Sequence, residues 1–189
     1  MMEAEALATS PLSRDGQTIY KAIKIEPQYR LEQITKVSRQ EARENIAVIK
    51  LETSKRFGSC AVATNGRSLA VVPVEGEHDH GLLSDEALKA SRQGKYKSDL
   101  ICLNGNLETN GKSFPRPEVG MFPNWEAVLP KEKAKFSVAL NPKLLLELAQ
   151  AIGADAVRLD FIDERSAITV TNNASSKPGF GLLMPMRIN

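Results

Sequence analysis

Hydrophobic and polar positions recur along this chain in an order that predicts a strand, a helix and further strands. The order is most regular near the C-terminus, where residues 136–140 alternate with the period of two that is typical of a half-buried strand. A helix is predicted next, because Asn141 is a good N-cap, Pro142 suits the first helical position, and apolar side chains follow at helical spacing. That apolar stripe consists of Leu144, Leu145, Leu148, Ala149 and Ile152, and Gly153 closes the helix. Three more strands are predicted at 157–161, 167–170 and 182–184.

Two earlier parts of the chain repeat this order with weaker patterns. The first copy predicts a strand at 20–25, a helix with apolar residues on one face from Leu31 to Val37, and strands at 47–51, 59–62 and 69–72. The second copy predicts a short strand at 82–83, a helix over 85–92 and a strand at 100–103. A period near 55 residues indicates repeated modules, with chance similarity among short strands as the alternative. The predicted fold class is α+β, built from repeated strand-helix-strand modules with mostly antiparallel sheets.

The domain organisation follows from these copies. We expect residues 1–16 to form a flexible N-terminal tail, because this segment is polar and rich in small residues. Modules 1 and 2 are predicted over residues 17–130 and a C-terminal module over 131–189. Residues 114–130 contain several prolines and are predicted to be an extended connector, since a residue before proline avoids the α conformation.

Composition places the protein among ordinary globular chains. Its 189 residues are 42% hydrophobic and 25% charged, which is enough apolar material for a core. No apolar run approaches the ~20 residues of a membrane span, and the first residues predict no secretory signal. The two cysteines, Cys60 and Cys102, are too few for a disulfide framework, so a cytoplasmic location is expected.

Charge is distributed unevenly along the chain. Residues 14–67 hold 11 Lys and Arg against 6 Asp and Glu, whereas the net charge of residues 68–189 is −1. A basic segment of this kind is either an ordinary solvated surface or a surface that faces phosphates, for which Lys and Arg supply affinity without any required spacing.

Few residues in the sequence could carry catalysis. His78 and His80 could ligate a metal, but no further Cys or His lies near them to complete a tetrahedral site. Neither cysteine has a base close in sequence, and the common nucleotide-binding, hydrolase and zinc-protease motifs are absent. We therefore expect no enzyme activity, no metal and no cofactor; a small metal-dependent enzyme using His78 and His80 is a remote alternative.

Several segments together resemble one family. Residues 136–148 (FSVALNPKLLLEL), followed by 157–161 (VRLDF), resemble the last module of the bacterial β sliding clamp, the processivity factor of DNA polymerase III. Residues 182–188 (LLMPMRI) resemble the terminal strand of that clamp, and 62–71 (VATNGRSLAV) resemble its VATDGHRLAV segment. Residues 122–130 (FPNWEAVLP) resemble its connector between domains. The resemblance implies a DNA clamp-like fold without catalytic residues.

The resemblance also implies two binding surfaces. In that family the helices face duplex DNA and contact phosphates without reading bases. The candidate DNA-binding residues on the first two predicted helices are Arg30, Lys36, Arg39, Arg43, Lys89 and Arg92. Partner proteins of clamps insert a short linear peptide into an apolar pocket between domains, and the matching residues here are Leu69, Pro130, Leu182, Met184 and Met186. The alternative is that these five side chains are core residues of the sheet, because alternate positions of one strand point the same way in either case.

The function expected from the sequence is that of a sliding-clamp-like DNA polymerase processivity factor. Such a protein would bind duplex DNA without sequence specificity and capture linear peptide motifs of polymerase or repair partners. It would be a homo-oligomer, because three modules per chain would need about four copies to supply the dozen modules of a ring. The alternative is a clamp-derived adaptor or decoy that binds clamp-interacting peptides but forms no ring.

Overall fold

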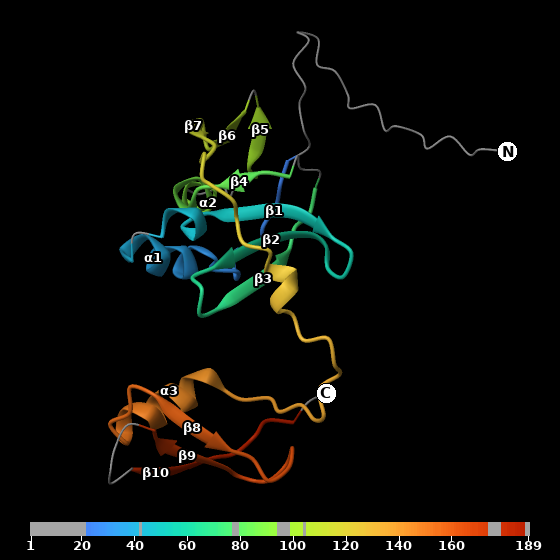
Figure 1. Ribbon diagram of the computed structural model, residues 1–189. Helices are drawn as coiled ribbons and strands as arrows, with labels where there is room; N and C mark the ends of the chain where they lie inside the picture. The colour runs from blue at the N-terminus through green and yellow to red at the C-terminus, as the bar shows by residue number, and fades with distance from the viewer. Residues whose placement is uncertain are drawn as a thin grey trace, which may run out of the picture. The chain divides into compact units, whose positions relative to one another are not determined.

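The structure is a computed structural model that describes residues 22–41, 43–76, 80–93, 99–103, 105–173 and 179–187. The chain divides into two compact units, Met1–Val128 and Leu129–Asn189, and each is described by itself below (Figure 1). Both units combine helices with antiparallel sheets, so the α+β class predicted from the sequence is confirmed. The predicted tail at 1–16 lies outside the described residues.

The N-terminal unit begins with one module of the predicted kind. Its elements are α1 (Glu32–Gln40), the 3₁₀ turn η1 (Glu44–Ile46), β1 (Ile49–Ser54), β2 (Gly58–Thr64) and β3 (Leu69–Pro73). The β2–β3 connection is the predicted Asn65-Gly66 turn, in which Gly66 adopts a positive φ of 82° and the Asn65 side chain accepts hydrogen bonds from the backbone of Arg67 and Ser68. Of the strand predicted at 20–25, the described part forms two isolated bridges, at Ile23 and Lys24.

A second module completes this unit. Its elements are β4 (Leu82–Leu83), α2 (Asp85–Ser91), β5 (Ile101–Leu103), β6 (Asn106–Thr109) and β7 (Lys112–Pro115). Helix α2 begins where the Ser84 hydroxyl accepts a hydrogen bond from the Ala87 amide, which satisfies one of the free N–H groups of the first turn.

The two modules are joined reciprocally through their first strands. β4 of the second module adds to the first sheet, which has the order β3-β2-β1-β4. Ile23, ahead of α1, pairs in turn with Leu100 beside β5 of the second module. A shared core of aliphatic residues lies under both helices and includes Leu31, Leu51 and Leu88. The N-terminal unit is therefore one domain made of two interlocked modules.

The connector differs in one respect from the extended segment predicted at 114–130. Trp125–Val128 forms a 3₁₀ turn, η2, instead of extended chain. Trp125 is buried there; its indole N–H donates to the carboxylate of Glu52 on β1, and its ring lies 6.0 Å from that of Phe57. The turn forms because it buries the indole ring of the one tryptophan in the chain and places the indole N–H next to a hydrogen-bond acceptor.

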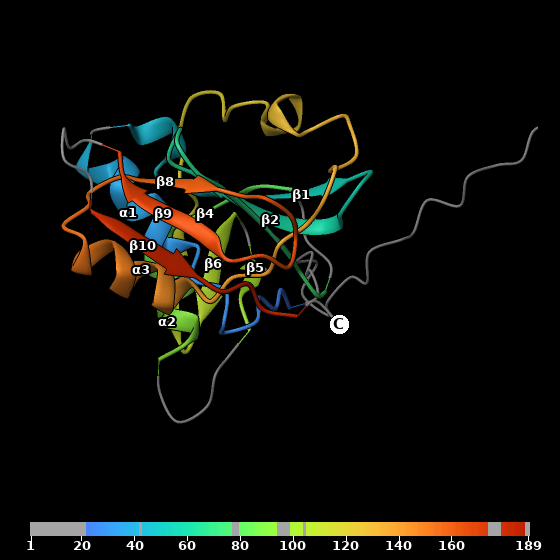
Figure 2. The same ribbon diagram turned by 90° about the horizontal axis from the view of Figure 1, so that it is seen from below.

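The C-terminal unit holds a single module. It consists of α3 (Pro142–Ala151), β8 (Val157–Asp160), β9 (Ile168–Asn172) and β10 (Phe180–Leu183), and the three strands run side by side in the order β10-β9-β8 (Figure 2). The predicted helix and its cap are confirmed, since the Asn141 side chain accepts from the Lys143 amide. The strand predicted at 136–140 is reduced to one bridge, between Ala139 and Met186.

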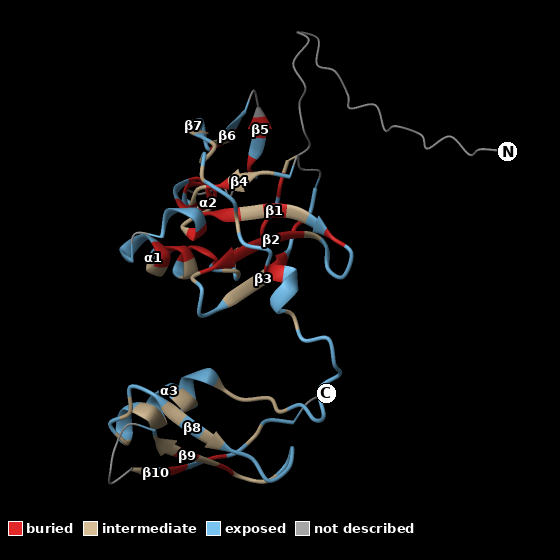
Figure 3. Cartoon of the chain, in the orientation of Figure 1, coloured by how far each residue is buried: buried red, intermediate tan, exposed pale blue. Residues whose placement is uncertain are grey.

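Burial differs strongly between the units. Buried residues run through the helices and the first sheet of the N-terminal unit, whereas no residue of α3 is buried (Figure 3). Within the described part of the C-terminal unit, the buried large side chains are Ile168, Val170 and Leu183, which lie on the sheet face that α3 covers. One module alone therefore builds only a thin core.

Candidate DNA and peptide interfaces

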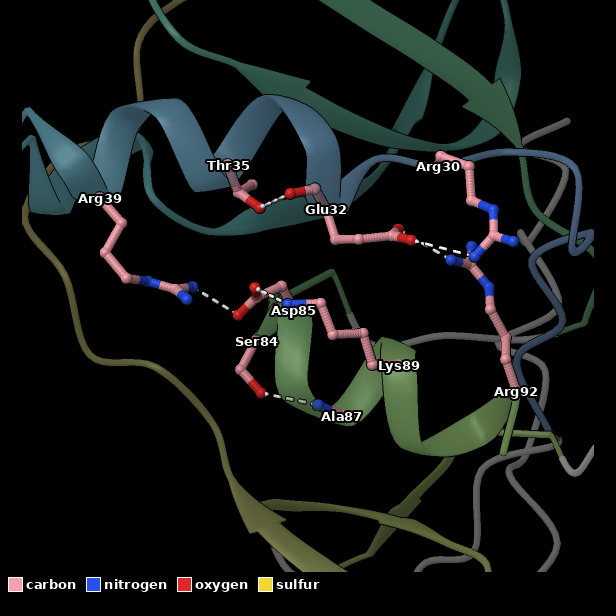
Figure 4. A network of polar contacts seen from close by, with 9 residues as sticks. All are labelled: Arg30, Glu32, Thr35, Arg39, Ser84, Asp85, Ala87, Lys89 and Arg92. Atoms are coloured by element: carbon pink, nitrogen blue, oxygen red, sulfur yellow. Dashed lines mark hydrogen bonds and ion pairs between the residues drawn. The ribbon is translucent and has the colours of Figure 1, made fainter. Parts of the chain in front are cut away.

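The predicted basic residues of α1 and α2 surround two buried carboxylates. Glu32, at the first position of α1, is 4% exposed and receives Arg92 from the end of α2, with Nη1 of Arg92 2.7 Å from Oε2. Asp85, at the first position of α2, is 0% exposed and receives Arg39 from the end of α1. Figure 4 shows the two contacts at opposite ends of the helix pair. The first residue of each helix thus pairs with the residue seven positions after the start of the other helix, which is Arg39 in α1 and the C-cap Arg92 in α2.

Each buried carboxylate also holds a second cation. Nζ of Lys89 lies 2.8 Å from Oδ2 of Asp85, and Nη1 of Arg30 lies 3.5 Å from Oε1 of Glu32. Burial by itself would raise the pKa of Asp85, but the hydrogen bonds from Arg39 and Lys89 outweigh it and hold this pKa below its usual value. The same contact raises the pKa of Arg39. Asp85 is therefore ionised at neutral pH, and each of these carboxylates fixes two cations.

All six candidate DNA-binding residues lie in the N-terminal unit, and they differ in how exposed their side chains are and in how many contacts they make. Lys36 is exposed on α1, and Arg43 precedes η1, where it donates to the backbone oxygen of Asn65 and pairs with Glu41. Arg92 is the most covered of the six, because it also donates to the backbone oxygen of Tyr29. Of the remaining three, Arg39 and Lys89 are about half exposed and Arg30 is mostly exposed.

Sequence reasoning missed the two carboxylates that organise these cations. The signal was present, because Glu32 precedes Arg39 by seven residues and Asp85 precedes Arg92 by the same interval. An acid and a base separated by two helical turns lie on the same face of a helix. Two such helices can pack antiparallel, so that the acid at the start of each helix pairs with the base at the end of the other.

The candidate peptide-binding residues are placed in both units. Leu69 is half-buried at the start of β3 in the N-terminal unit, and Pro130 is exposed at the start of the C-terminal unit. Leu182 on β10, with Met184 and Met186 after it, is 57%, 64% and 54% exposed, respectively. These three side chains therefore do not form the core of their own sheet, which speaks against the alternative for this part of the set.

The exposed face of β10 has a simple origin. Gly181 and Leu183 are buried against α3, so the alternation of the strand turns Phe180 and Leu182 to the opposite face of the sheet. Phe180 is more exposed than Leu182 and was not predicted as a site residue, although its alternation with Leu182 could have indicated it. Together with Met184 they form an apolar stripe, defined as Phe180, Leu182 and Met184, which is open to solvent.

The groups considered for catalysis are not assembled into a site among the described residues. His80 contacts the Thr53 hydroxyl at 2.9 Å, and His78 lies outside the described residues. Cys60 and Cys102 are both buried and form no disulfide, the sulfur of Cys102 accepts from Arg116, and burial raises the pKa of Cys60. No cluster of three potential metal ligands occurs in the described ranges, nor does any described helix have the length and apolarity to cross a membrane.

Among the solved structures that match this chain are two bacterial beta clamps. The first is the beta sliding clamp of C. crescentus, with a TM-score of 0.63 and 20% identity, over 96% of this chain and 54% of the clamp chain. The second is the beta clamp of H. pylori in complex with 5-chloroisatin, with a TM-score of 0.58 and 13% identity, over 94% of this chain and 51% of the clamp chain. The chain has a sliding-clamp fold.

The fold resemblance predicted from sequence segments is thus confirmed. The chain spans about half the length of the clamps that it matches. No family model matches the sequence, and a search of curated proteins finds no match. Sequence similarity to known clamps is therefore low, and the likeness rests on the sliding-clamp fold itself.

Proposed function

We propose that this chain acts as a sliding-clamp-like processivity factor, which lies along or encircles duplex DNA and captures linear peptide motifs of polymerase or repair partners. The observation that carries the proposal is the exposure of Leu182, Met184 and Met186 at the end of the last strand, in a chain with a sliding-clamp fold. The role is one of binding without catalysis, and it requires no cofactor.

The peptide-binding half of the proposal rests on the chemistry of the strand end. Leucine supplies shape, and the two methionines are flexible and polarizable, so the surface can adapt to different apolar anchors. Large apolar side chains that stay exposed on one side of a strand are typical of surfaces that bind other proteins. Of the five predicted residues, Leu182, Met184 and Met186 are the ones we propose as the main contacts; Leu69 and Pro130 are proposed as additional contacts.

The DNA-binding half rests on cations fixed at a surface. Glu32 and Asp85 are buried and each holds two basic side chains, so the cations outnumber the carboxylates that they pair with; Glu86 reduces this excess near Arg39. Lys36 and Arg43 add two more cations in the same unit. Cations held in place lose little conformational freedom when they meet phosphates, and contacts of this kind are independent of sequence.

Peptide binding is tested by fluorescence anisotropy with a labelled, extended peptide that carries leucine and phenylalanine anchors. We expect a Kd on the order of micromolar, because a short peptide makes a small interface and loses conformational entropy on binding. Met184→Ala and Met186→Ala should each raise the Kd about fivefold or more, since each removes an apolar contact worth about 1 kcal/mol.

The matched control for peptide binding is Met121→Ala, because Met121 is the most exposed methionine described and lies in the N-terminal unit. All three variants should keep the melting temperature of the parent. The peptide half of the function is contradicted if the two C-terminal variants bind as tightly as Met121→Ala.

DNA binding is tested with a labelled duplex over a range of salt. We expect weak binding that is independent of sequence and falls steeply between about 50 and 200 mM salt. Lys36→Glu and Arg43→Glu should weaken it, whereas Lys112→Glu, the same charge change on β7, should not. Peptide binding without any salt-sensitive DNA binding would leave an adaptor that does not act on DNA.

A further inference from the structure

Helix α3 has one face whose chemistry differs from that of its two counterparts. In α1, positions 1, 5 and 8 are Glu32, Lys36 and Arg39, and in α2 they are Asp85, Lys89 and Arg92. These three positions lie on one side of a helix, and they form the side on which α1 and α2 meet. In α3 the same positions are Pro142, Leu146 and Ala149.

The alignment of the three helices is supported by how they pack on their sheets. Position 4 and position 7 are Thr35 and Ser38 in α1, and both are buried. The same positions in α3 are Leu145 and Leu148, which are half-buried and turned toward β9 and β10. The side of α3 that carries Leu146 therefore corresponds to the helix-pairing side of α1 and α2, and Leu146 is 60% exposed.

The sheet of the C-terminal unit has matching open edges. In the N-terminal unit β1, the first strand after the helix, pairs with β4, the strand that precedes the other helix. In the C-terminal unit the equivalent of β1 is β8, which is an edge strand within the described residues. Within the described part of the chain, the segment 136–140 that precedes α3 makes strand-type backbone hydrogen bonds on one side only, through Ala139 to Met186. Edges of this kind are available for pairing with another chain.

We propose that the C-terminal unit pairs with the C-terminal unit of a second copy of this chain. A two-fold axis would bring α3 against α3 of the partner and place segment 136–140 of each copy along β8 of the other. The result is a complete two-module domain of the kind that α1 and α2 already form within one chain. A two-fold interface is self-complementary, so one arrangement satisfies both helices and both pairs of open edges at once.

Charge favours a second copy over other helices of this fold as the occupant. The pairing faces of α1 and α2 each need an opposite charge, because Glu32 and Asp85 are buried and would otherwise remain unpaired. The pairing face of α3 is uncharged and complements only another uncharged face. Leu146 is 60% exposed on this face, and Phe136, at the start of the segment that would pair with β8, is 48% exposed, so both provide apolar surface for such an interface.

The first test is the mass of the intact chain in solution, measured by light scattering at tens of micromolar. We expect a dimer of the 20.7 kDa chain, or a multiple of that dimer. Leu146→Glu places a charge on the pairing face and should raise the dimer dissociation constant at least tenfold. Leu144→Glu is the matched control, because Leu144 is also exposed but occupies position 3, on the opposite side of α3. It should leave the mass unchanged.

The second test uses a cross-link that only the proposed symmetry permits. Contacts between position 1 and position 8 place the two-fold axis near position 5, so the Leu146→Cys side chains of two copies should lie close together and form a disulfide under mild oxidation. Leu144→Cys should not, and the native Cys60 and Cys102 are buried. The product is a band of doubled mass on a non-reducing gel.

Three outcomes would overturn the proposal. A monomeric parent chain at these concentrations would show that α3 needs no partner copy or is covered within its own chain. Equal masses of Leu146→Glu and the parent would place the interface elsewhere, as would equal cross-linking of the two cysteine variants. Circular dichroism of each variant checks that it is folded. Because none of these measurements involves DNA or peptide, their failure is separable from failure of the proposed function.

Discussion

At the scale of single residues, the Asp85 carboxylate is fully buried yet accepts hydrogen bonds from two side chains that reach solvent. A buried charge is tolerated only when its partners are in place, so Arg39 and Lys89 are required for folding before they are available to a ligand. Glu32 plays the equivalent part for Arg92 and Arg30. Reversing the charge of Arg39 would therefore disturb folding as well as DNA binding, whereas Lys36 offers a cleaner test of DNA binding alone.

Asp85→Asn tests this role, because it keeps the shape of the side chain and removes its charge. We expect the free energy of unfolding in urea at pH 7 to fall by about 1–3 kcal/mol. Lys89→Ala, which removes a half-exposed partner, should cost less than about 1 kcal/mol. The pKa of Asp85 is lower in the folded state than in the unfolded state. The ionised carboxylate therefore stabilises the fold above the unfolded-state pKa of about 4, and this stabilisation is lost as the pH falls through the folded-state pKa. The difference in free energy of unfolding between the parent and Asp85→Asn should thus decrease below about pH 4. A difference that increases there would contradict this account.

At the scale of elements, the sequence predicted best where a local signal was sufficient. The helix after Asn141 begins at its cap, and the turn at Asn65-Gly66 forms as its residue types demand. Segment 136–140 has the alternation of a strand, yet among the described residues only Ala139 forms a β-bridge, because alternation defines a face and not a neighbouring strand. The 3₁₀ turn at Trp125 depends on Glu52, a partner far away in the sequence that no local pattern could reveal.

Gly181 shows how closely α3 approaches its sheet. A Cβ atom built on Gly181 would lie 2.6 Å from Cδ1 of Leu148, so the glycine allows the helix to rest on β10. We expect Gly181→Val to lower the free energy of unfolding of the C-terminal unit by about 1–3 kcal/mol. Urea unfolding monitored by circular dichroism measures this change. Leu182→Val, on the exposed face of the same strand, is the control and should change stability by less than about 0.5 kcal/mol. Equal effects of the two substitutions would mean that α3 does not pack on this strand as described.

At the scale of the whole molecule, the repeated modules were predictable from sequence, but their unequal completeness was not. The first two modules share a core and exchange first strands, while the third covers its sheet with a helix that has no buried residue. In the sequence α3 has the most regular apolar stripe of the three helices, yet none of its residues is buried. The stripe includes Leu144, which the structure leaves half exposed. Burial depends on what packs opposite a face, and no pattern within one segment carries that information.

The two units should therefore differ in local stability. β2 in the N-terminal unit contains five consecutive buried residues, from Cys60 to Thr64, whereas β9 in the C-terminal unit alternates buried and half-buried positions. Opening a thin core exposes little apolar surface, so its amides exchange through low-energy openings. We test this in the Leu146→Glu variant, in which a second copy cannot protect the C-terminal unit. By hydrogen exchange and mass spectrometry, we expect the amides of β8 to β10 to exchange at least about tenfold faster than those of β1 and β2.

The parent chain provides the matched measurement for this difference. If a second copy covers α3, exchange of β8 and α3 amides should slow as protein concentration rises, because association stabilises only the folded unit. Exchange of β2 amides should not depend on concentration, since this strand is enclosed within one chain. If β9 exchanges as slowly as β2 in Leu146→Glu, the C-terminal module is stable without a partner, and its exposed apolar surface is better explained by peptide binding alone.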